Sequence, residues 1–275
     1  MIIDAHTHLF APDAERYPVD PLASYRPEVE GSVELLRLQM DEAGVDRALT
    51  ISPWPYRWDM SYVLDILPEN RNWLAVGVLV DPFSPDGPDL LTRYVDEYGV
   101  CGLRIQGRIL RMEPLDQPAT TPLWQRASDL GITLDVNASQ LEYSAVANRA
   151  RQFPDLRIVL DHCGYVSSDL YPSEPHVEPV LRMTEHPNVF AKLSFVGAAS
   201  SQPYPCDDVH WMVRQIVDAF GPERCVFGSN FPTAQYNQTL SYAETMRLFA
   251  EAIELTEVER EWILGRTAQG LWRWG

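Results

Sequence analysis

Ile2-Ile3-Asp4-Ala5-His6-Thr7-His8 is a short apolar run that ends in two histidines two positions apart. The run is typical of a buried strand, and residues i and i+2 of a strand point to the same side. Both imidazoles therefore leave the strand end in one direction. Imidazole is the commonest metal ligand in proteins and titrates near neutral pH. A lone pair of this kind is often incidental, so its meaning depends on partners that come later in the chain.

The composition indicates a globular chain with an acidic surface. The 275 residues are 45% hydrophobic and carry a formal net charge of −17. This balance argues against nucleic acid and anionic membranes, which both require a basic face. No apolar run approaches the ~20 residues of a membrane span, and we expect no signal peptide. We therefore predict a cytoplasmic protein that acts on a small molecule, and the sequence leaves a homo-oligomer open.

The basic and sulfur-containing residues narrow this description. Lys192 is the single lysine, so an anionic substrate would have to be held by particular arginines. The four cysteines have no CxxC spacing and are predicted to be reduced thiols: Cys101, Cys163, Cys206 and Cys225.

Strand and helix signals alternate along the whole chain. Apolar runs predict strands over residues 2–4, 47–51, 73–80, 100–105, 132–136, 157–161, 189–193 and 225–228. The segments between them predict helices, the first with Ser32 as N-cap and Gly44 at its end, the second stopped by Pro68. Two further helices end the chain, over 241–253 and 256–264.

Eight strands that each precede a helix, without a linker, predict one closed (β/α)8 TIM-barrel domain over residues 1–275 with extra C-terminal helices. An open doubly wound sheet would need a glycine-rich turn after the first strand, where this chain has His6-Thr7-His8.

The active sites of such barrels lie at the C-terminal ends of the strands. Polar side chains occupy nearly every predicted strand end, and we expect them to face one mouth. They are His6 and His8, Arg104 with Arg108 and Arg111, Asp135 and Asn137, Asp161 and His162, Lys192 and Ser194, and Asn230.

With these residues in place, the chain resembles the amidohydrolase superfamily, in the amidohydrolase-related branch of carboxylated-pyrone lactonases, sugar lactonases and some aromatic decarboxylases. The resemblance spans the chain and includes Ser61 to Asp65 and a C-terminal helix ending Gly265-Arg266-Thr267-Ala268. Its motifs are Asp4-Ala5-His6-Thr7-His8, Gly102-Leu103-Arg104, Val159-Leu160-Asp161-His162-Cys163-Gly164, Pro187-Asn188-Val189-Phe190-Ala191-Lys192-Leu193-Ser194 and Phe227-Gly228-Ser229-Asn230-Phe231-Pro232.

The chain departs from the family pattern in its metal-binding positions. The family usually has an aspartate on the eighth strand, which binds metal and activates water, and here that position is Asn230. An amide does not take up a proton at neutral pH and is a weaker ligand than a carboxylate. The fifth strand lacks the histidine of metal-dependent members. The lysine that bridges two metals has no equivalent either, because Lys192 lies on the seventh strand.

A catalytic zinc site generally uses three protein ligands and a water. His6, His8 and His162 could provide them for one zinc or manganese ion, and Asp135 offers a carboxylate. Because of Asn230, we favour a metal-free or weakly metal-bound enzyme. The resemblance permits this, since the pyrone lactonase branch hydrolyses its substrate without metal.

His162 is the strongest single candidate, to polarise a carbonyl or to shuttle a proton, although a core histidine bonded to a backbone carbonyl is the alternative. Arg104 suits a substrate carboxylate or a salt bridge in the mouth, and Arg108 is a weaker candidate. Asn137 and Ser194 are candidates to line the substrate site. So are Trp58 and Trp54, with Tyr56 and Arg57, which follow the second strand and could wall an aromatic or cyclic substrate; buried packing is at least as consistent for this group. Trp262, Trp272 and Trp274 are expected in outer packing or a subunit interface.

These observations predict a hydrolase of a small, carboxylated lactone. In this hypothesis His6, His8 and His162 surround the carbonyl and the attacking water, Arg104 holds a carboxylate, and Asn230 orients the water or the substrate. Two alternatives stay open. One is a metal-assisted decarboxylase or amide hydrolase on the same barrel. The other is a catalytically silent protein that binds a small acid.

Overall fold

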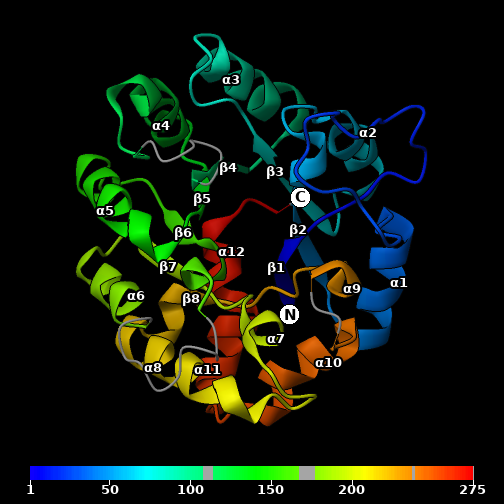
Figure 1. The fold of residues 1–275 in the computed structure, drawn as a ribbon, viewed down its shortest axis with the longest axis vertical. Helices are drawn as coiled ribbons and strands as arrows, with labels where there is room; N and C mark the ends of the chain where they lie inside the picture. The colour runs from blue at the N-terminus through cyan, green and yellow to red at the C-terminus, as the bar shows by residue number, and fades with distance from the viewer. Residues whose placement is uncertain (108–113, 167–176, 237–238, 275) are drawn as a thin grey trace.

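The strands form a parallel barrel whose order follows the chain. The computed structural model describes residues 1–107, 114–166, 177–236 and 239–274. Figure 1 shows helices as a ring around the strands. The (β/α)8 prediction is confirmed, and each predicted strand overlaps an observed one. The strands are β1 (Ile3–Thr7), β2 (Arg47–Ile51), β3 (Leu74–Leu79), β4 (Gly102–Gln106), β5 (Thr133–Asn137), β6 (Ile158–Leu160), β7 (Val189–Lys192) and β8 (Cys225–Val226).

The helices follow the strands as expected, with short additional turns in the loops. The first helix has the predicted boundaries: the Ser32 side chain accepts a hydrogen bond from the Leu35 N–H, and Gly44 ends the helix with a φ of 72°. The helices are α1 (Val33–Ala43), α2 (Ser61–Asn70), α3 (Gly87–Tyr98), α4 (Thr121–Asp129), α5 (Tyr143–Gln152), α6 (Glu178–Arg182), α7 (Val196–Ala199), α8 (His210–Phe220), α9 (Thr233–Tyr236), α10 (Tyr242–Arg247), α11 (Glu257–Glu261) and α12 (Thr267–Leu271).

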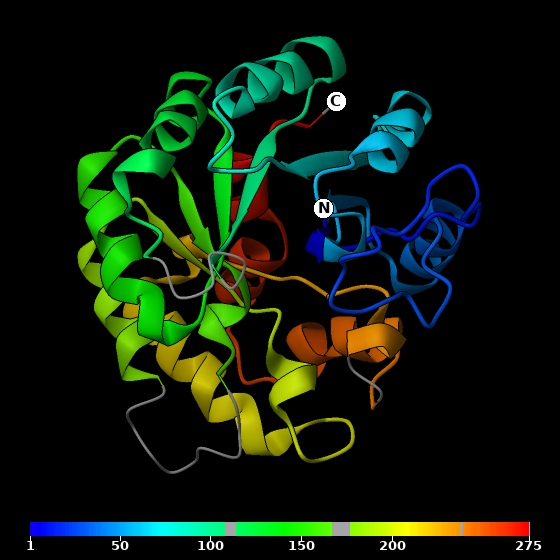
Figure 2. The ribbon, with the colours of Figure 1, turned by 45° about the horizontal axis from the view of Figure 1, so that its top comes forward.

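Two expectations about local structure were wrong. Pro68 does not stop the second helix, because α2 continues to Asn70, whose side-chain amide donates to the Ile66 carbonyl at 2.8 Å and closes the last turn. Trp272 does not lie in the outer layer. It is buried after α12, the red helix that Figure 2 shows behind the strands, and Lys192 Nζ lies 5.3 Å from its ring centroid. The indole covers the end of the barrel opposite the mouth.

Strand β1 closes the barrel against the chain that follows β8. The Ala5 N–H donates to the Phe227 carbonyl at 3.0 Å, and the Asn230 N–H donates to the His6 carbonyl at 2.9 Å. Because these bonds join the two ends of the sheet, they also set the position of Asn230 relative to the histidine on β1.

The carboxylate of Asp4 lies completely buried at this seam. It accepts hydrogen bonds from the Ser229 N–H at 2.9 Å and from the Tyr242 hydroxyl at 3.0 Å. Burial raises the pKa of Asp4 to about 6, against the lowering effect of these donors. Asp4 therefore joins three elements: β1, the segment after β8, and α10.

The four cysteines are buried free thiols, as expected. No helix in the described ranges has the length and apolar character that a bilayer crossing requires.

Replacing Tyr242 by Phe tests the role of this seam. The change removes one donor to a buried carboxylate, so we expect the free energy of unfolding to fall by about 1.5–3 kcal/mol in urea denaturation. Tyr98→Phe is the matched control, because the Tyr98 hydroxyl makes no hydrogen bond within the described chain. Equal effects of the two substitutions would show that the hydroxyl of Tyr242 does not stabilise the closure.

Candidate active site

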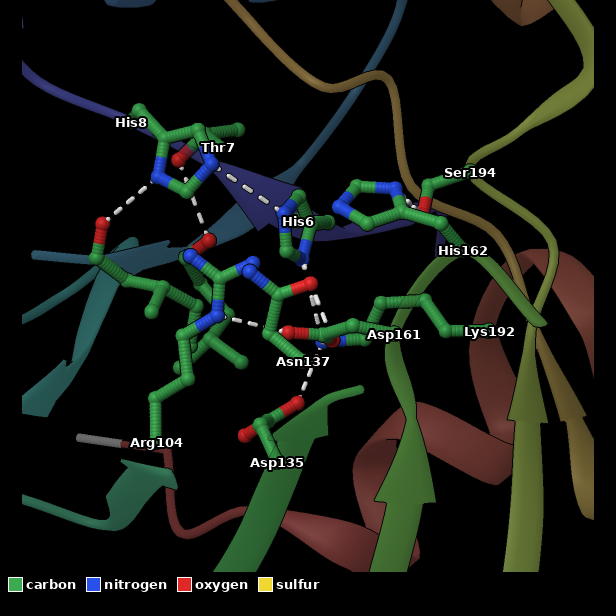
Figure 3. Close-up of polar contacts among 12 residues, drawn as sticks. His6, Thr7, His8, Arg104, Asp135, Asn137, Asp161, His162, Lys192 and Ser194 are labelled. Carbon is green, nitrogen blue, oxygen red and sulfur yellow. Dashed lines mark hydrogen bonds and ion pairs between the residues drawn. The ribbon is translucent and has the colours of Figure 1, made fainter. Parts of the chain in front are cut away.

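The polar residues at the strand ends converge at one mouth of the barrel, as predicted (Figure 3). His6 and His8 come from the end of β1, Arg104 from β4, Asp135 and Asn137 from β5, Asp161 and His162 from the segment after β6, and Lys192 from β7. The parallel register places Arg104 beside Asp135 on the neighbouring strand. In the sheet, β6 lies directly between β5, which carries Asp135, and β7, which carries Lys192.

The histidines of β1 form a directed chain of hydrogen bonds. His8 Nδ1 lies 2.8 Å from the Ile51 carbonyl oxygen, so this nitrogen carries the proton and donates. Lys192 Nζ lies 3.2 Å from His6 Nδ1. An ammonium can only donate, so we assign His6 Nδ1 as the acceptor and His6 Nε2 as the nitrogen that donates to His8 Nε2, 3.2 Å away.

Lys192 lies at the centre of a completely buried ionic cluster. Its ammonium contacts the Asp135 carboxylate and lies 2.9 Å from Asp161 Oδ1. The other oxygen of Asp161 accepts from Arg104 Nε at 2.7 Å. Two cations thus face two carboxylates, a balance that a buried site requires because an unpaired charge there is strongly destabilising.

The protonation states follow from burial and from these charges. Burial raises the pKa of Asp135, although Lys192 opposes the shift. Burial would also raise the pKa of Asp161, but Lys192 and Arg104 hold it well below its usual range. Burial lowers the pKa of His8 to about 3 and that of His162 to about 4, so both imidazoles are neutral at neutral pH.

His162 is oriented by the strand that follows it. Its Nδ1 lies 2.9 Å from the Ser194 hydroxyl, and its ring centroid lies 4.6 Å from that of His6. The backbone at His162 has a φ of 53°, a conformation that residues other than glycine seldom adopt. Such conformations persist where the surrounding structure enforces them, often at functional sites. Ser194 therefore positions His162 and does not line the large cavity.

A cavity of about 860 Å³ opens above these residues. Its described lining contains no aspartate or glutamate, although the chain has 39 acidic residues. Its charged members are Arg57 and Arg104. The remaining lining side chains that bear on function are aromatic, amide or imidazole groups: Tyr25, Trp54, Gln106, Asn137, Tyr165, Tyr236, Asn230, His8 and His162.

The other predicted residues fall in different places. Asn230 lines the cavity and has a φ of 61°, and its buried Oδ1 has no hydrogen-bond partner in the part of the chain that the structure describes. Asn137 also lines it and donates to the Gln106 side chain. Trp58 is not part of the cavity's described lining; it packs edge-on against Trp54, which is, with ring centroids 5.6 Å apart. Arg108 lies outside the described residues.

The chain is similar to known proteins over nearly its whole length. The family model described as "Amidohydrolase" matches residues 3–274. The chain belongs to the amidohydrolase family. It is 27% identical over 237 residues to the L-fucono-1,5-lactonase of Burkholderia ambifaria, an alignment that covers 85% of this chain and 81% of that one.

Two solved structures share the fold of this amidohydrolase. One is a probable 2-pyrone-4,6-dicarboxylic acid hydrolase from Acinetobacter baumannii with citric acid bound, with a TM-score of 0.84, 18% identity and 98% of both chains covered. The other is an amidohydrolase from Burkholderia multivorans with bound zinc, with a TM-score of 0.75, 20% identity and the same coverage. The family and its lactonase relative identify the chain as a hydrolase.

Zinc is thus bound by a structural neighbour, and the residues here can be tested for the same role. The two histidine Nε2 atoms are 3.2 Å apart, close to the ~3.3 Å between two ligands of a tetrahedral zinc with Zn–N bonds of ~2.0 Å. The rest of the donor set does not fit. Lys192 and Arg104 bind the nearby carboxylates, and position 230 supplies a neutral amide. Within the described ranges, no three His, Cys, Asp or Glu side chains converge as a metal cluster.

The sequence did not indicate that Asp161 and Lys192 are partners in one cluster, and it did not indicate the tyrosines of the cavity. Arg57 was predicted beside Trp54 as a wall of the substrate site, and both residues line the cavity. Asp161 carried a signal, because it directly precedes His162 at a strand end. The pairing of Lys192 with Asp135 and Asp161 is visible only once the strands are in register. Tyr25 and Tyr236, whose hydroxyls are 2.9 Å apart, come from the loop after β1 and from α9, which no periodic pattern connects.

The donor set predicts little retained metal in the native amidohydrolase. After dialysis against zinc and then buffer, elemental mass spectrometry should find well below one equivalent of zinc. Asn230→Asp should raise zinc content toward one equivalent, because a carboxylate then joins the two histidines. Asn148→Asp, on α5 outside the cavity, is the control. Close to one equivalent in the native protein would contradict this assessment of the site.

The ionic cluster predicts a large and partly reversible loss of stability. Lys192→Met leaves two buried carboxylates without their shared cation, so we expect unfolding to become easier by about 3–5 kcal/mol. Adding Asp135→Asn should restore part of that loss, because one uncompensated charge is removed. The double-mutant cycle can be followed by urea unfolding. If Lys192→Met lowers the free energy of unfolding by less than about 1 kcal/mol, the Lys192 ammonium does not compensate the two buried carboxylates as proposed.

Proposed function

We propose that this amidohydrolase hydrolyses a small lactone that carries a carboxylate. The observation that carries the proposal is the charge of the cavity: in a chain of net charge −17, the charged side chains of its described lining are Arg57 and Arg104. A cationic cavity in an acidic protein attracts a small anion at close range, while the surface charge disfavours polyanions.

The shape of the cavity supports a small ring as substrate. A volume of about 860 Å³ lies within the ordinary range for small-molecule sites. Trp54, Tyr25 and Tyr236 supply flat apolar surfaces with polar edges, which suit a planar or half-planar ring that also carries oxygen atoms.

The site contains the groups that water attack on an ester carbonyl requires. Asn230 Oδ1 is buried and has no hydrogen-bond partner within the described ranges, so it can accept a hydrogen bond from the attacking water. Arg104 donates only its Nε to Asp161, and its terminal nitrogens make no hydrogen bond within the described chain. They can therefore stabilise the negative charge that develops on the carbonyl oxygen.

In the proposed reaction, the water oxygen bonds to the carbonyl carbon while His162 accepts a water proton. The bond between the carbonyl carbon and the ring oxygen then breaks, and His162 returns the proton to the departing ring oxygen. The product is the open hydroxy acid. His162 is assigned as the base because it is neutral in the free enzyme and because Ser194 fixes its ring. Burial lowers its pKa and so weakens it as a base, while the Asp161 carboxylate opposes that shift and stabilises the imidazolium that forms. Hydrogen bonds hold the two histidines of β1 in orientation: Lys192 donates to His6, and His8 donates to the Ile51 carbonyl.

The relatives support this class of substrate. The similar protein from Burkholderia ambifaria is named for the hydrolysis of a sugar lactone, and the neighbour from Acinetobacter baumannii for a pyrone dicarboxylic acid. Asn230 favours one rival, a protein that binds a small acid without converting it, because the family aspartate is absent. Turnover of a lactone by the native chain would exclude that rival.

His162→Asn is the most direct test of this mechanism. The amide cannot accept the water proton, so we expect kcat to fall about 10²–10⁴-fold with intact folding. A panel of five- and six-membered lactones, with and without a carboxylate, can be followed by acid release in weak buffer. His210→Asn, on α8 outside the cavity, is the control. Near-native turnover in His162→Asn would contradict the assigned proton transfer.

A further inference from the structure

We propose that Arg57 binds the carboxylate of the substrate and so selects acidic over neutral lactones. The inference rests on the proposed lactone hydrolysis and assigns its specificity to one side chain. It also moves the carboxylate from Arg104, which the sequence pattern favoured, to an arginine in the loop after β2.

Arg57 is a cation whose ion pair with Asp20 is long and partly exposed. The nearest carboxylate oxygen, Asp20 Oδ1, lies 3.8 Å from Arg57 Nη1 and already accepts the Leu22 N–H at 2.7 Å. Arg57 Nε is buried and has no hydrogen-bond partner among the described residues. None of the guanidinium nitrogens donates a hydrogen bond within the described chain, so the two terminal nitrogens are available to a ligand, while the buried Nε is shielded from the cavity.

Arg104 differs from Arg57 in this respect. Its Nε is bound at 2.7 Å to Asp161, and this ion pair is buried on both sides. The positive charge of Arg104 is therefore largely compensated before a substrate enters. A substrate carboxylate gains more from Arg57, because Asp20, 3.8 Å away and partly exposed, compensates its charge only weakly.

The backbone around Arg57 shows that its placement is enforced. Arg57 has φ 47° and ψ −108°, a conformation that is unfavourable for a side chain with a Cβ. A hydrogen bond from its N–H to the Trp54 carbonyl at 2.8 Å holds the turn. Strain of this kind persists where a side chain must be aimed. Described non-glycine residues with positive φ include four that line the cavity: Arg57, His162, Tyr165 and Asn230.

Trp54 completes the proposed carboxylate site. The Arg57 guanidinium carbon lies 5.4 Å from the Trp54 ring centroid, a cation–π arrangement that restricts the orientation of the fork. Trp54 itself lines the cavity. A carboxylate can therefore take two parallel hydrogen bonds from Arg57 while the attached lactone ring packs beside the indole.

The test compares two lactones that differ in one group: D-glucaro-1,5-lactone, which ends in a carboxylate, and D-glucono-1,5-lactone, which ends in a hydroxymethyl group. We expect the native enzyme to prefer the acid. Arg57→Gln should lower the ratio of kcat/KM for the acid to that for the neutral lactone by about 10–100-fold, chiefly through KM. Arg57→Lys should retain part of the ratio. Arg93→Gln, which removes an exposed cation on α3, should leave it unchanged.

An equal loss of kcat/KM for both lactones in Arg57→Gln would overturn the inference, because Arg57 would then only support the loop. A native enzyme without preference for the acid would overturn it too, while lactone hydrolysis itself would stand.

A binding measurement keeps the test decisive if neither lactone is turned over and the proposed function fails. Benzoate and benzamide form a matched anionic and neutral pair that cannot be hydrolysed as lactones, and their binding can be measured by calorimetry. We expect benzoate to bind about tenfold more weakly to Arg57→Gln than to the native protein, with benzamide unaffected. No difference for benzoate would overturn the inference.

Discussion

The buried ammonium of Lys192 is the interaction on which the interior of this barrel depends. It contacts carboxylates from β5 and from the segment after β6, and it orients His6 on β1. Without this cation, Asp135 and Asp161 would face each other in a volume that excludes water. Because Trp272 covers the cluster from below, the charges cannot be solvated from the far end of the barrel. One lysine therefore sets both the charge balance of the core and the direction of hydrogen bonding at the mouth.

The pairing of charges in this cluster also limits which groups are free to react in the cavity. The carboxylates that could serve a metal are bound to Lys192 and Arg104, and the eighth-strand position is an amide. The remaining reactive groups are neutral imidazoles, an unpartnered amide oxygen and two arginines. This set is suited to holding water and an anionic ester, with charge supplied by arginine. The charged side chains of the described cavity lining are arginines in a chain of net charge −17, and this contrast is what supports the proposed anionic substrate.

Much of the fold could be predicted because it depends on local patterns. Alternating strands and helices indicated the barrel, and the i, i+2 spacing of His6 and His8 placed both at one strand end. The pairings that give these residues their roles join positions far apart in the chain, such as Arg104 with Asp161, and depend on strand register. Arg57 was predicted to wall the substrate site, but its charge role was not predicted, because that role depends on an unusual turn and on the distance to Asp20, neither of which leaves a periodic signal. Pro68 and Trp272 were misplaced because side-chain contacts decided their positions.

The central claim is that water attacks the lactone carbonyl with groups supplied by the chain itself. Single-turnover hydrolysis of a carboxylated six-membered lactone in ¹⁸O-water tests it most directly, using protein dialysed against a chelator. The account predicts that one ¹⁸O atom enters the new carboxylate and that the rate is unchanged by the chelator. Label in the hydroxyl group of the product, or loss of the reaction with the chelator, would contradict it.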